Sequence, residues 1–361
     1  MTNRNLQVTL DGIVFGLQTY GGISNYWGRL IQHLDGLPQV QCHNVLPKRI
    51  RYAEYNNDWT HKSSVVRENL PNVLSRYADI KDLNSNHVFH SSYYRVPENK
   101  SVRYVVTVYD FIHERYRHGP ARWVHSFQKL RSIRLADAVI CISNATRDDV
   151  LRYAGDVDPG KVRVVYLGVD QDTFYQDRNG HAASLENMVL YVGQRARYKR
   201  FDLAVDALAH CPELTLGIVG PVLSQEEVAF LNSRLHSRWH SFGPVSSSRL
   251  RELYSNAFAF IFPSDYEGFG LPILEAMACG CPVVAAHTSS LPEVGGQAAL
   301  YAHEQQPESF AAALTTLYDS ADDRRSAIDA GMQRAREFSW ERTFTETLAI
   351  YQGGDFVSRH V

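Results

Sequence analysis

Residues 264–282 read SDYEGFGLPILEAMACGCP, and this stretch decides the predicted fold. It follows the apolar run 257–262, which is typical of an inner strand, and a helix is predicted to begin near Pro272. A glycine-rich turn at such a point directs free backbone amides toward the positive end of the helix, where anionic oxygen atoms bind. Gly268 and Gly270 let the backbone approach a ligand closely. The stretch therefore predicts a strand–turn–helix unit that holds an anion.

Two glutamates lie at this turn. Glu267 comes before it, and Glu275 falls on the second turn of the predicted helix. A carboxylate accepts two hydrogen bonds from vicinal hydroxyls, so either side chain suits the diol of a ribose or a hexose. The structural alternative is that Glu275 caps or solvates its helix while Glu267 sits in a surface loop. The surrounding stretch favours the binding interpretation.

Outward from this stretch, strand and helix patterns alternate along the chain. Strands are predicted at 6–10, 102–109, 138–143, 162–166, 188–192, 214–219, 257–262 and 282–285, and a further strand candidate within 88–92 ends at His90. Helices are predicted after Gly22, at 120–135, and near 201–210, 225–237, 247–255, 272–279, 308–318 and 322–338, with a last one from Trp340. The alternation predicts an α/β fold with parallel sheets covered on both faces.

The chain of 361 residues is too long for one ordinary core, so two domains are expected. The polar stretch 168–183, which contains Gly180, is the predicted linker. The predicted domains are 1–169 and 170–340, followed by a C-terminal helical segment, 341–361, that crosses back to the first domain.

Charge and cysteine content narrow the functional class. A net charge of −2 argues against binding polyanions through bulk electrostatics, so no nucleic acid is expected as a partner. The five cysteines have apolar neighbours and are interpreted as buried thiols in a reducing compartment. Residues 1–5 show no signal-peptide core, and no stretch approaches the roughly 18 apolar residues of a membrane span. A cytoplasmic location is expected, with attachment to a membrane surface left open.

A second candidate element is YVGQRARYKRF, residues 191–201. The predicted strand ends at Gly193, and four cations follow it: Arg195, Arg197, Lys199 and Arg200. Cations at the carboxyl edge of a doubly wound sheet commonly bind phosphate. The alternative is a solvated basic loop.

The first half holds weaker candidates. The turn YGGIS, residues 20–24, places Gly21 and Gly22 before a helix, which suits a phosphate or a simple turn. It is not the dinucleotide fingerprint with three spaced glycines. The cluster VYDFIHE, residues 108–114, ends a buried strand and offers Asp110 and His113 as site residues. His113 and His90 are each as readily explained as structural histidines.

The pair Glu267-x7-Glu275 within GFGLPILEAMACGCPVV resembles the signature of retaining glycosyltransferases of family 4 (group 1). The resemblance covers roughly residues 10–350. It implies the GT-B fold, in which two Rossmann-like, doubly wound parallel-sheet domains face a cleft that holds the active site. The stretches YGGI and YDFIHE are similar to those of bacterial surface-polysaccharide mannosyltransferases.

The resemblance also implies roles for individual residues. Arg195 and Lys199 match a Gly-x-Arg-x-x-x-Lys element that holds the donor diphosphate and stabilises the departing nucleotide. Glu267 would orient the sugar, and Glu275 would hold the ribose. Many relatives carry His-Asp where this chain has Tyr109-Asp110, so only Asp110 carries over, and Tyr109 and His113 remain open for the histidine role. The donor-binding residues expected on this basis are Gly21, Gly22, Gly193, Arg195, Lys199, Val245, Glu267, Gly268, Phe269, Gly270, Leu271 and Glu275.

The predicted reaction is retaining transfer of a hexose from a nucleotide-diphosphate sugar to a glycan or lipid-linked glycan in surface polysaccharide synthesis. GDP-mannose is the favoured donor; a UDP- or dTDP-sugar is the alternative, as is a non-catalytic nucleotide-sugar-binding protein. No cofactor and no metal are expected, because the Asp-x-Asp stretches 156–158 and 170–172 lie in loop-like sequence. The oligomeric state is not predicted.

The segment 115–134 holds six Arg and Lys residues and no acid. Trp123, Phe127, Leu130 and Ile133 lie among them at helical spacing. Such a helix either contacts anionic lipid or packs its apolar stripe on the sheet.

Overall fold

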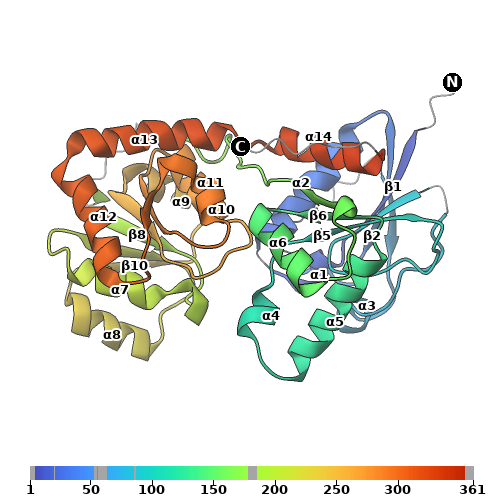
Figure 1. The fold of residues 1–361 in the computed structure, drawn as a ribbon, viewed down its shortest axis with the longest axis horizontal. Coiled ribbons are helices and arrows are strands. Elements are labelled where there is room, and N and C mark those ends of the chain that lie inside the picture. Colours follow the sequence, from blue (N-terminus) through green and yellow to red (C-terminus); the bar gives the residue numbers. More distant parts are fainter. Residues whose placement is uncertain are drawn as a thin grey trace. The chain divides into compact units, whose positions relative to one another are not determined.

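The chain divides into two compact units in the computed structural model (Figure 1). One comprises Met1–Leu167 and Trp340–Val361, and the other Gly168–Ser339. The structure describes residues 5–19, 21–52, 55, 63–84, 87–177 and 185–353. The predicted boundaries at 169/170 and 340/341 lie within two residues of this division. Tyr20 and residues 178–183 of the predicted linker, Gly180 among them, lie outside the described residues.

The first unit is built on a parallel sheet with strand order β3-β2-β1-β4-β5-β6-β7. Its strands are β1 (Leu6–Asp11), β2 (Val40–Leu46), β3 (Ser64–Arg67), β4 (His87–Ser91), β5 (Arg103–Val108), β6 (Ala138–Cys141) and β7 (Val162–Val164). Its helices are α1 (Val14–Leu17), α2 (Gly22–Gly36), α3 (Asn72–Ser75), α4 (Ile112–Tyr116), α5 (Pro120–Leu135), α6 (Asn144–Tyr153) and α14 (Trp340–Tyr351).

The second unit repeats the plan, with strand order β10-β9-β8-β11-β12-β13, again all parallel. Its strands are β8 (Met188–Val192), β9 (Thr215–Val219), β10 (Trp239–Gly243), β11 (Ala259–Phe262), β12 (Val283–Ala286) and β13 (Leu300–Ala302). Its α-helices are α7 (Phe201–Ala209), α8 (Gln225–Leu235), α9 (Ser247–Asn256), α10 (Leu271–Ala278), α11 (Leu291–Gly295), α12 (Pro307–Asp319) and α13 (Ala321–Arg336).

When the strands of each unit are numbered from its own first strand, both sheets have the order 3-2-1-4-5-6, and the first sheet adds a seventh strand. The direction in which successive strands are added reverses beside strand 1. The two doubly wound parallel sheets confirm the predicted Rossmann-like α/β fold. The reversal lies between β1 and β4 in one unit and between β8 and β11 in the other. In open parallel sheets, ligands bind outside the carboxyl ends of the strands at such a reversal.

Strand burial follows the sequence pattern. The inner strands β6, β11 and β12 are buried along their full length, as expected for parallel strands covered on both faces. Strand β2 alternates buried with exposed or half-buried residues, and most of β10 is half-buried. These two strands, with β3 and β13, were absent from the predicted set: β2, β3 and β10 are not uniformly apolar, and β13 has only three residues.

Helix α14 completes the first unit, although it is the last element of the chain (Figure 1). Its Tyr351 hydroxyl lies 2.6 Å from Nδ1 of His90 on β4. Thr343 of α14 donates a hydrogen bond to the carbonyl oxygen of Tyr166, and Arg103 on β5 donates to that of Ile350.

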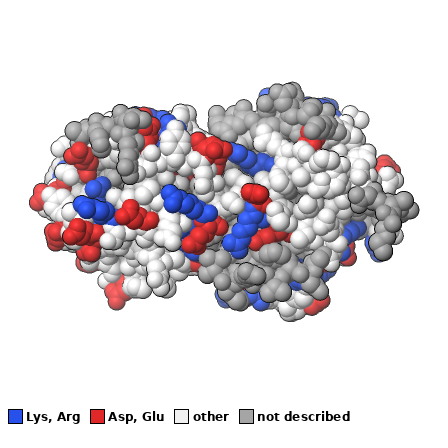
Figure 2. Space-filling model, turned by 90° about the horizontal axis from the view of Figure 1, so that it is seen from above, with Lys and Arg blue, Asp and Glu red and all other residues white. Residues whose placement is uncertain are grey.

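Charged side chains of both signs are interspersed on the face of the molecule drawn in Figure 2. This distribution agrees with the net charge of −2. Within the part of the chain that the structure describes, no helix has the length and apolar character needed to cross a membrane.

Candidate functional site

The predicted donor-binding residues of the second unit lie on loops that follow β8, β10 and β11. Gly193, Arg195 and Lys199 follow β8, Val245 follows β10, and Glu267 to Leu271 follow β11. Because all strands of this sheet are parallel, these loops share its carboxyl edge. The loops after β8 and β11 flank the reversal of strand order, so the predicted residues gather where a ligand is expected.

Lys199 and Glu267 meet across this reversal. Nζ of Lys199 lies 2.5 Å from Oε1 of Glu267, and the two side chains are only 19% and 11% exposed. The amide of Asp265 donates to the carbonyl oxygen of Tyr198, which ties the two loops together. Arg200, with a left-handed φ of +49°, ends the short 3₁₀ turn that carries Lys199. The structure thus joins two predicted residues that are 68 positions apart.

Hydroxyl side chains after β12 hold the loop that carries Glu267. Ser290 donates to the carbonyl oxygens of Glu267 and Phe269 at 2.9 and 2.8 Å, and Ser289 also donates to that of Glu267. Thr288 donates to the carbonyl oxygen of Ser264. The sequence analysis missed these three residues, although a run of hydroxyls after a buried strand was the available signal. They fix the backbone of the turn.

Helix α10 begins where the turn ends, at Gly270. This glycine has a φ of +103°, and a Cβ there would lie 2.9 Å from Leu291 Cδ2. A side chain at this position would therefore be strained and crowded. At the start of α10, Pro272 has no N–H and the amide of Ile273 donates to the carbonyl oxygen of Gly270, so Leu271 supplies the helix-start amide that is suited to an anion. The side chain of Phe269 is buried, and its carbonyl oxygen accepts a hydrogen bond from Ser290.

Glu275 lies on the second turn of α10 and is partly buried. Burial raises the pKa of its carboxyl to about 7. Among the described residues, the carboxyl of Glu275 has neither a hydrogen bond nor an ion pair. A desolvated carboxylate without a protein partner is suited to accept hydrogen bonds from a ligand's hydroxyls.

Arg195 is held by a residue that the sequence analysis did not single out. Its Nε lies 2.6 Å from Oε1 of Glu227, and its Nη2 donates to the carbonyl oxygens of Pro221 and Val222. Glu227 also completes the capping box of α8 with Ser224. Nη1 of Arg195 is buried and has no hydrogen-bond partner in the described part of the chain. The guanidinium is therefore fixed in place by Glu227 and the two carbonyl oxygens.

Gly193 and Val245 mark the ends of two neighbouring loops. Gly193 has a φ of +132° where β8 ends, a conformation that favours glycine. Val245 directly precedes Ser246, whose side chain caps the start of α9. Both residues lie at the carboxyl edge of the sheet.

In the first unit, Asp110 follows β5 and lies in a fixed loop. Its Oδ1 accepts a hydrogen bond from the amide of Ile112 at 3.0 Å. The buried Lys129 of α5 donates to the carbonyl oxygen of Asp110 and to Oε2 of Glu114, both at 2.8 Å. Although burial disfavours its charge, His125 and Lys129 lower the pKa of Glu114 to about 2. This buried ion pair holds the Asp110 loop on α5.

The glycines of the YGGIS turn lie at the start of α2. Gly21 is the N-cap residue, and Gly22 is the first residue of this 15-residue helix. Both are exposed, and they follow β1 at the carboxyl edge of the first sheet.

Tyr109, His113 and His90 take different places in this unit. Tyr109 is buried and accepts a hydrogen bond from Nε1 of Trp27, so its hydroxyl is used in the core. His113 is half-buried and stacks on His125 with ring centroids 3.9 Å apart. Burial and the neighbouring His125 lower the pKa of His113 to about 4. His90 is fully buried between Tyr351 and Thr107, which makes it a structural residue.

Other predicted features have simple surroundings. All five cysteines are buried free thiols. Asp156 pairs with Arg134, and Asp158 caps a short turn at Gly160. Over the described ranges, no group of three or more His, Cys, Asp and Glu side chains is arranged to hold a metal ion.

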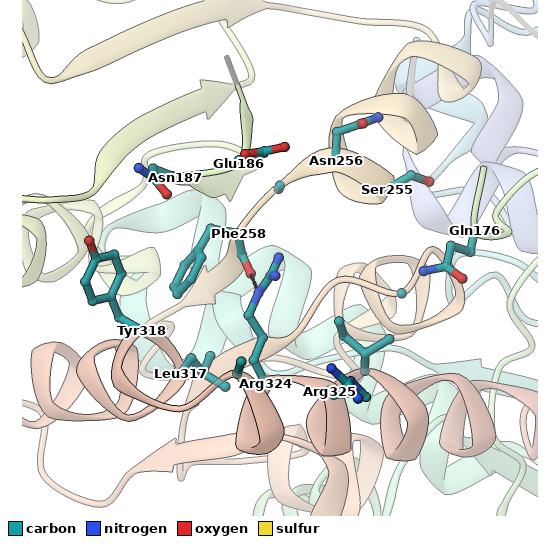
Figure 3. Close-up of a pocket in the computed structure, with 14 residues that line it drawn as sticks. Gln176, Glu186, Asn187, Ser255, Asn256, Phe258, Leu317, Tyr318, Arg324 and Arg325 are labelled. Atoms are coloured by element: carbon teal, nitrogen blue, oxygen red, sulfur yellow. Dashed lines mark hydrogen bonds between the residues drawn. The ribbon is translucent and has the colours of Figure 1, made fainter. Parts of the chain in front are cut away.

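A pocket of about 570 Å³ opens elsewhere in the second unit (Figure 3). Asn187 and Phe258, which line it, directly precede β8 and β11, and Arg324 comes from α13. The pocket therefore lies toward the amino ends of these strands and contains none of the predicted site residues. Since ligands of doubly wound sheets bind at the carboxyl ends, we assign the donor site to the loops that carry Lys199 and Glu267.

Comparisons with known proteins agree with this geometry. The family model described as "Glycosyl transferases group 1" matches residues 175–334, and the model described as "Glycosyltransferase Family 4" matches residues 20–173. The chain is 32% identical over 262 residues to alpha-maltose-1-phosphate synthase of Mycolicibacterium smegmatis, which covers 65% of this chain and 67% of that protein.

A shorter match has higher identity. Over 110 residues the chain is 43% identical to O-antigen chain mannosyltransferase B of Escherichia coli, covering 30% of this chain and 29% of that protein. Among solved structures, HepE of Anabaena in complex with UDP and glucose aligns with a TM-score of 0.74 at 16% identity, covering 96% and 100% of the two chains. At this identity the structural likeness shows the fold.

Proposed function

The chain belongs to the group 1 and family 4 glycosyltransferases of GT-B fold and is a glycosyltransferase, and we propose that it transfers a hexose with retention from a nucleotide-diphosphate sugar. The observation that carries the proposal is the Lys199–Glu267 pair at the reversal of strand order, beside the start of α10, which no side chain of its N-cap residue caps.

The chemistry follows from where charge develops. The bond between the anomeric carbon and the diphosphate oxygen breaks, and negative charge accumulates on the leaving nucleotide. Lys199, Arg195 and the amides of Gly268 to Leu271 stabilise that charge. Glu267 orients the sugar hydroxyls, and Glu275 binds the ribose diol.

The acceptor oxygen forms the new bond to the same face of the anomeric carbon. Its proton passes to the departing diphosphate, so the reaction balances without a protein base. Asp110 and the Gly21–Gly22 turn belong to the acceptor-side unit of this proposal. We expect the transfer to need no metal ion.

We infer GDP-mannose as the donor. The support is the short match to the E. coli mannosyltransferase, together with the similarity of the YGGI and YDFIHE stretches to surface-polysaccharide enzymes. The relative solved with UDP and glucose supports the alternative, a UDP-sugar; a dTDP-sugar is the other alternative.

The proposed acceptor is a glycan or lipid-linked glycan in surface polysaccharide, including lipopolysaccharide, synthesis. A cytoplasmic location and peripheral contact of residues 115–134 with the inner face of the membrane are part of this proposal. The free, buried state of the five cysteines supports the reducing compartment.

Thermal-shift binding of GDP, UDP, dTDP and ADP and their sugar conjugates tests the donor, because a bound nucleotide stabilises the folded protein by mass action. A shift with GDP and GDP-mannose alone supports the mannose donor, whereas a shift with UDP or dTDP alone overturns it. Product analysis with the binding donor and a glycan acceptor then tests retention. Binding without any turnover would favour the non-catalytic alternative.

A further inference from the structure

Helix α5 has an inverted arrangement of polar and apolar side chains. Its inward face carries His125, Gln128, Lys129 and Ser132, all buried. Its outward face carries Trp123, Val124 and Phe127, all exposed. The two sets recur at spacings of three and four residues, so each occupies one face of the helix. An ordinary surface helix would show the opposite distribution.

Specific partners compensate the inward polar side chains. Lys129 binds Glu114 and the carbonyl oxygen of Asp110, and Nε2 of His125 lies 3.2 Å from the Tyr93 hydroxyl. Gln128 donates to the carbonyl oxygen of Arg76, and Ser132 hydrogen-bonds with Tyr104. Because these hydrogen bonds hold the polar face inside the unit, the orientation of α5 is fixed and its aromatic face stays in solvent.

Helix α3 extends this exposed apolar face. Arg131 of α5 makes two hydrogen bonds with Asp79, at 2.8 and 2.6 Å, and Gln128 reaches the last turn of α3, so the two segments are neighbours (Figure 1). Val73 and Leu74 of α3 are 68% and 60% exposed, and Trp123 and Phe127 are 70% and 71% exposed. Leu70 and Tyr77, which flank α3, are exposed as well. Exposed apolar side chains gathered on two neighbouring segments are typical of an interaction site.

The cations beside this surface differ in their partners. Residues 115–135 include six Arg and Lys residues and no acid. Four of the six pair with acids of other segments, namely Arg115 with Asp149, Lys129 with Glu114, Arg131 with Asp79 and Arg134 with Asp156, so among the described residues only Arg117 and Arg122 make no ion pair. Arg117 is exposed, and the guanidinium of Arg122 lies 5.5 Å from the centre of the Trp123 ring. Arg76 lies 4.9 Å from the ring of Tyr77. Cations beside exposed aromatic and aliphatic side chains complement an anionic lipid surface, where the rings enter the interface and the cations meet the headgroups.

We propose that the exposed surface of α3 and the first half of α5, which we call the α3–α5 surface, docks the protein on an anionic lipid bilayer. Trp123, Phe127, Val73 and Leu74 enter the interfacial layer, and Arg117 and Arg122 bind lipid headgroups. The anionic bilayer would present a lipid-linked acceptor to the enzyme, and this part of the proposal rests on the proposed function. Docking itself requires no sugar donor, so the two are separable by experiment.

The test is flotation of the full chain with phosphatidylcholine vesicles that either contain or lack phosphatidylglycerol, with no sugar donor present. We expect binding to the phosphatidylglycerol vesicles that weakens with added salt. The double variant Trp123→Ser/Phe127→Ser should bind at least about ten-fold more weakly, from the apolar area removed. The matched control Leu135→Ser/Tyr318→Ser removes two exposed apolar side chains outside the surface and should bind like the parent.

Two further measurements test the charged and the aromatic side chains separately. Arg117→Gln/Arg122→Gln should weaken binding only to the anionic vesicles. Brominated lipid should quench the tryptophan fluorescence of the parent protein and quench Trp123→Phe less, which needs no destabilised variant. No binding to anionic vesicles, equal binding by the surface and control variants, or no quenching would each overturn the proposal. Sedimentation showing a dimer that only Trp123→Ser/Phe127→Ser dissociates, without lipid binding, would instead assign the surface to a second copy.

Discussion

Glu227 uses one carboxylate for two purposes: it closes the capping box of α8 with Ser224, and it holds the guanidinium of Arg195 at 2.6 Å. The hydrogen bond with Arg195 keeps the pKa of Glu227 below its usual range. The start of a peripheral helix is thereby linked to a residue proposed to bind the donor diphosphate.

Replacing Glu227 by Ala should therefore raise the KM for the donor by about ten-fold, through loss of one charge-assisted contact, and change kcat less. The control is Ser224→Ala, which removes the cap hydroxyl but leaves the Arg195–Glu227 ion pair. It should cost about 1 kcal/mol of unfolding free energy without raising KM. Equal KM values for the two variants would remove the positioning role of Glu227.

Lys199 and Glu267 should behave as one unit in catalysis. Lys199→Met and Glu267→Gln are each expected to lower kcat/KM by about 10²-fold, as is typical of lost charge-stabilising groups. Because the two side chains contact each other, the double variant should lose much less than the product of the single losses. Initial rates for the four proteins of this cycle provide the test, and independent, multiplying losses would contradict it.

The raised pKa of Glu275 gives two opposite pH effects. Its carboxyl stays protonated in the folded protein up to about pH 7, while its reference pKa is 4.5. Its contribution to stability is therefore present below about pH 4.5 and is lost as the pH rises through 7. Donor binding, which uses the ionised form, should instead strengthen over the rise through pH 7.

The variant Glu275→Gln separates these effects. At pH 8 it should melt at a higher temperature than the parent and bind the donor more weakly. Its melting temperature and its donor affinity should each depend less on pH than those of the parent. Thermal unfolding and donor titration from pH 5 to pH 8 measure the two quantities. A parent protein whose donor affinity falls as the pH rises would refute the ribose-binding role.

The buried pair of Lys129 and Glu114 should be costly to break from one side. Lys129→Met leaves the carboxylate of Glu114 buried without its charged partner and should lower the unfolding free energy by about 3 kcal/mol. The double variant Lys129→Met/Glu114→Gln should recover part of this loss. Urea unfolding of the three proteins tests the prediction, which fails if the double variant is less stable than Lys129→Met.

Tyr109 and His113 should differ in their effects on activity. Tyr109→Phe removes a buried hydrogen bond to Trp27 and should cost about 1 kcal/mol of stability while activity persists. His113→Ala should lower turnover with little loss of stability, since the ring is half-buried at the loop of Asp110. The reverse pattern would assign the polar role to Tyr109.

The sequence predicted the uniformly apolar strands and the turn at Glu267 because both depend on local pattern. Strand β11 is uniformly apolar, and Gly270 has a positive φ that favours glycine, so the residue type itself indicates the turn. Strands β2 and β10 were missed because one alternates buried and exposed residues and the other is mostly half-buried.

The partners of the candidate site were harder to predict. Glu227 lies 32 positions from Arg195, and Ser290 reaches Glu267 from 23 positions away. Their roles come from the parallel sheet, which brings separate loops to one edge. Ser290 donates its hydrogen bonds to backbone carbonyl oxygens, so the side-chain types around Glu267 do not predict this contact.

Helix α14 has a consequence for the order in which the chain folds during synthesis. His90 on β4 finds its partner Tyr351 only after the whole of Gly168–Ser339 has been translated. Until α14 is synthesised, the first unit therefore lacks the hydroxyl that bonds to His90. By that time the second unit already has all of its own strands and helices. On a nascent chain, Gly168–Ser339 should thus reach a protease-resistant state first, and the first unit should do so only after α14 has emerged.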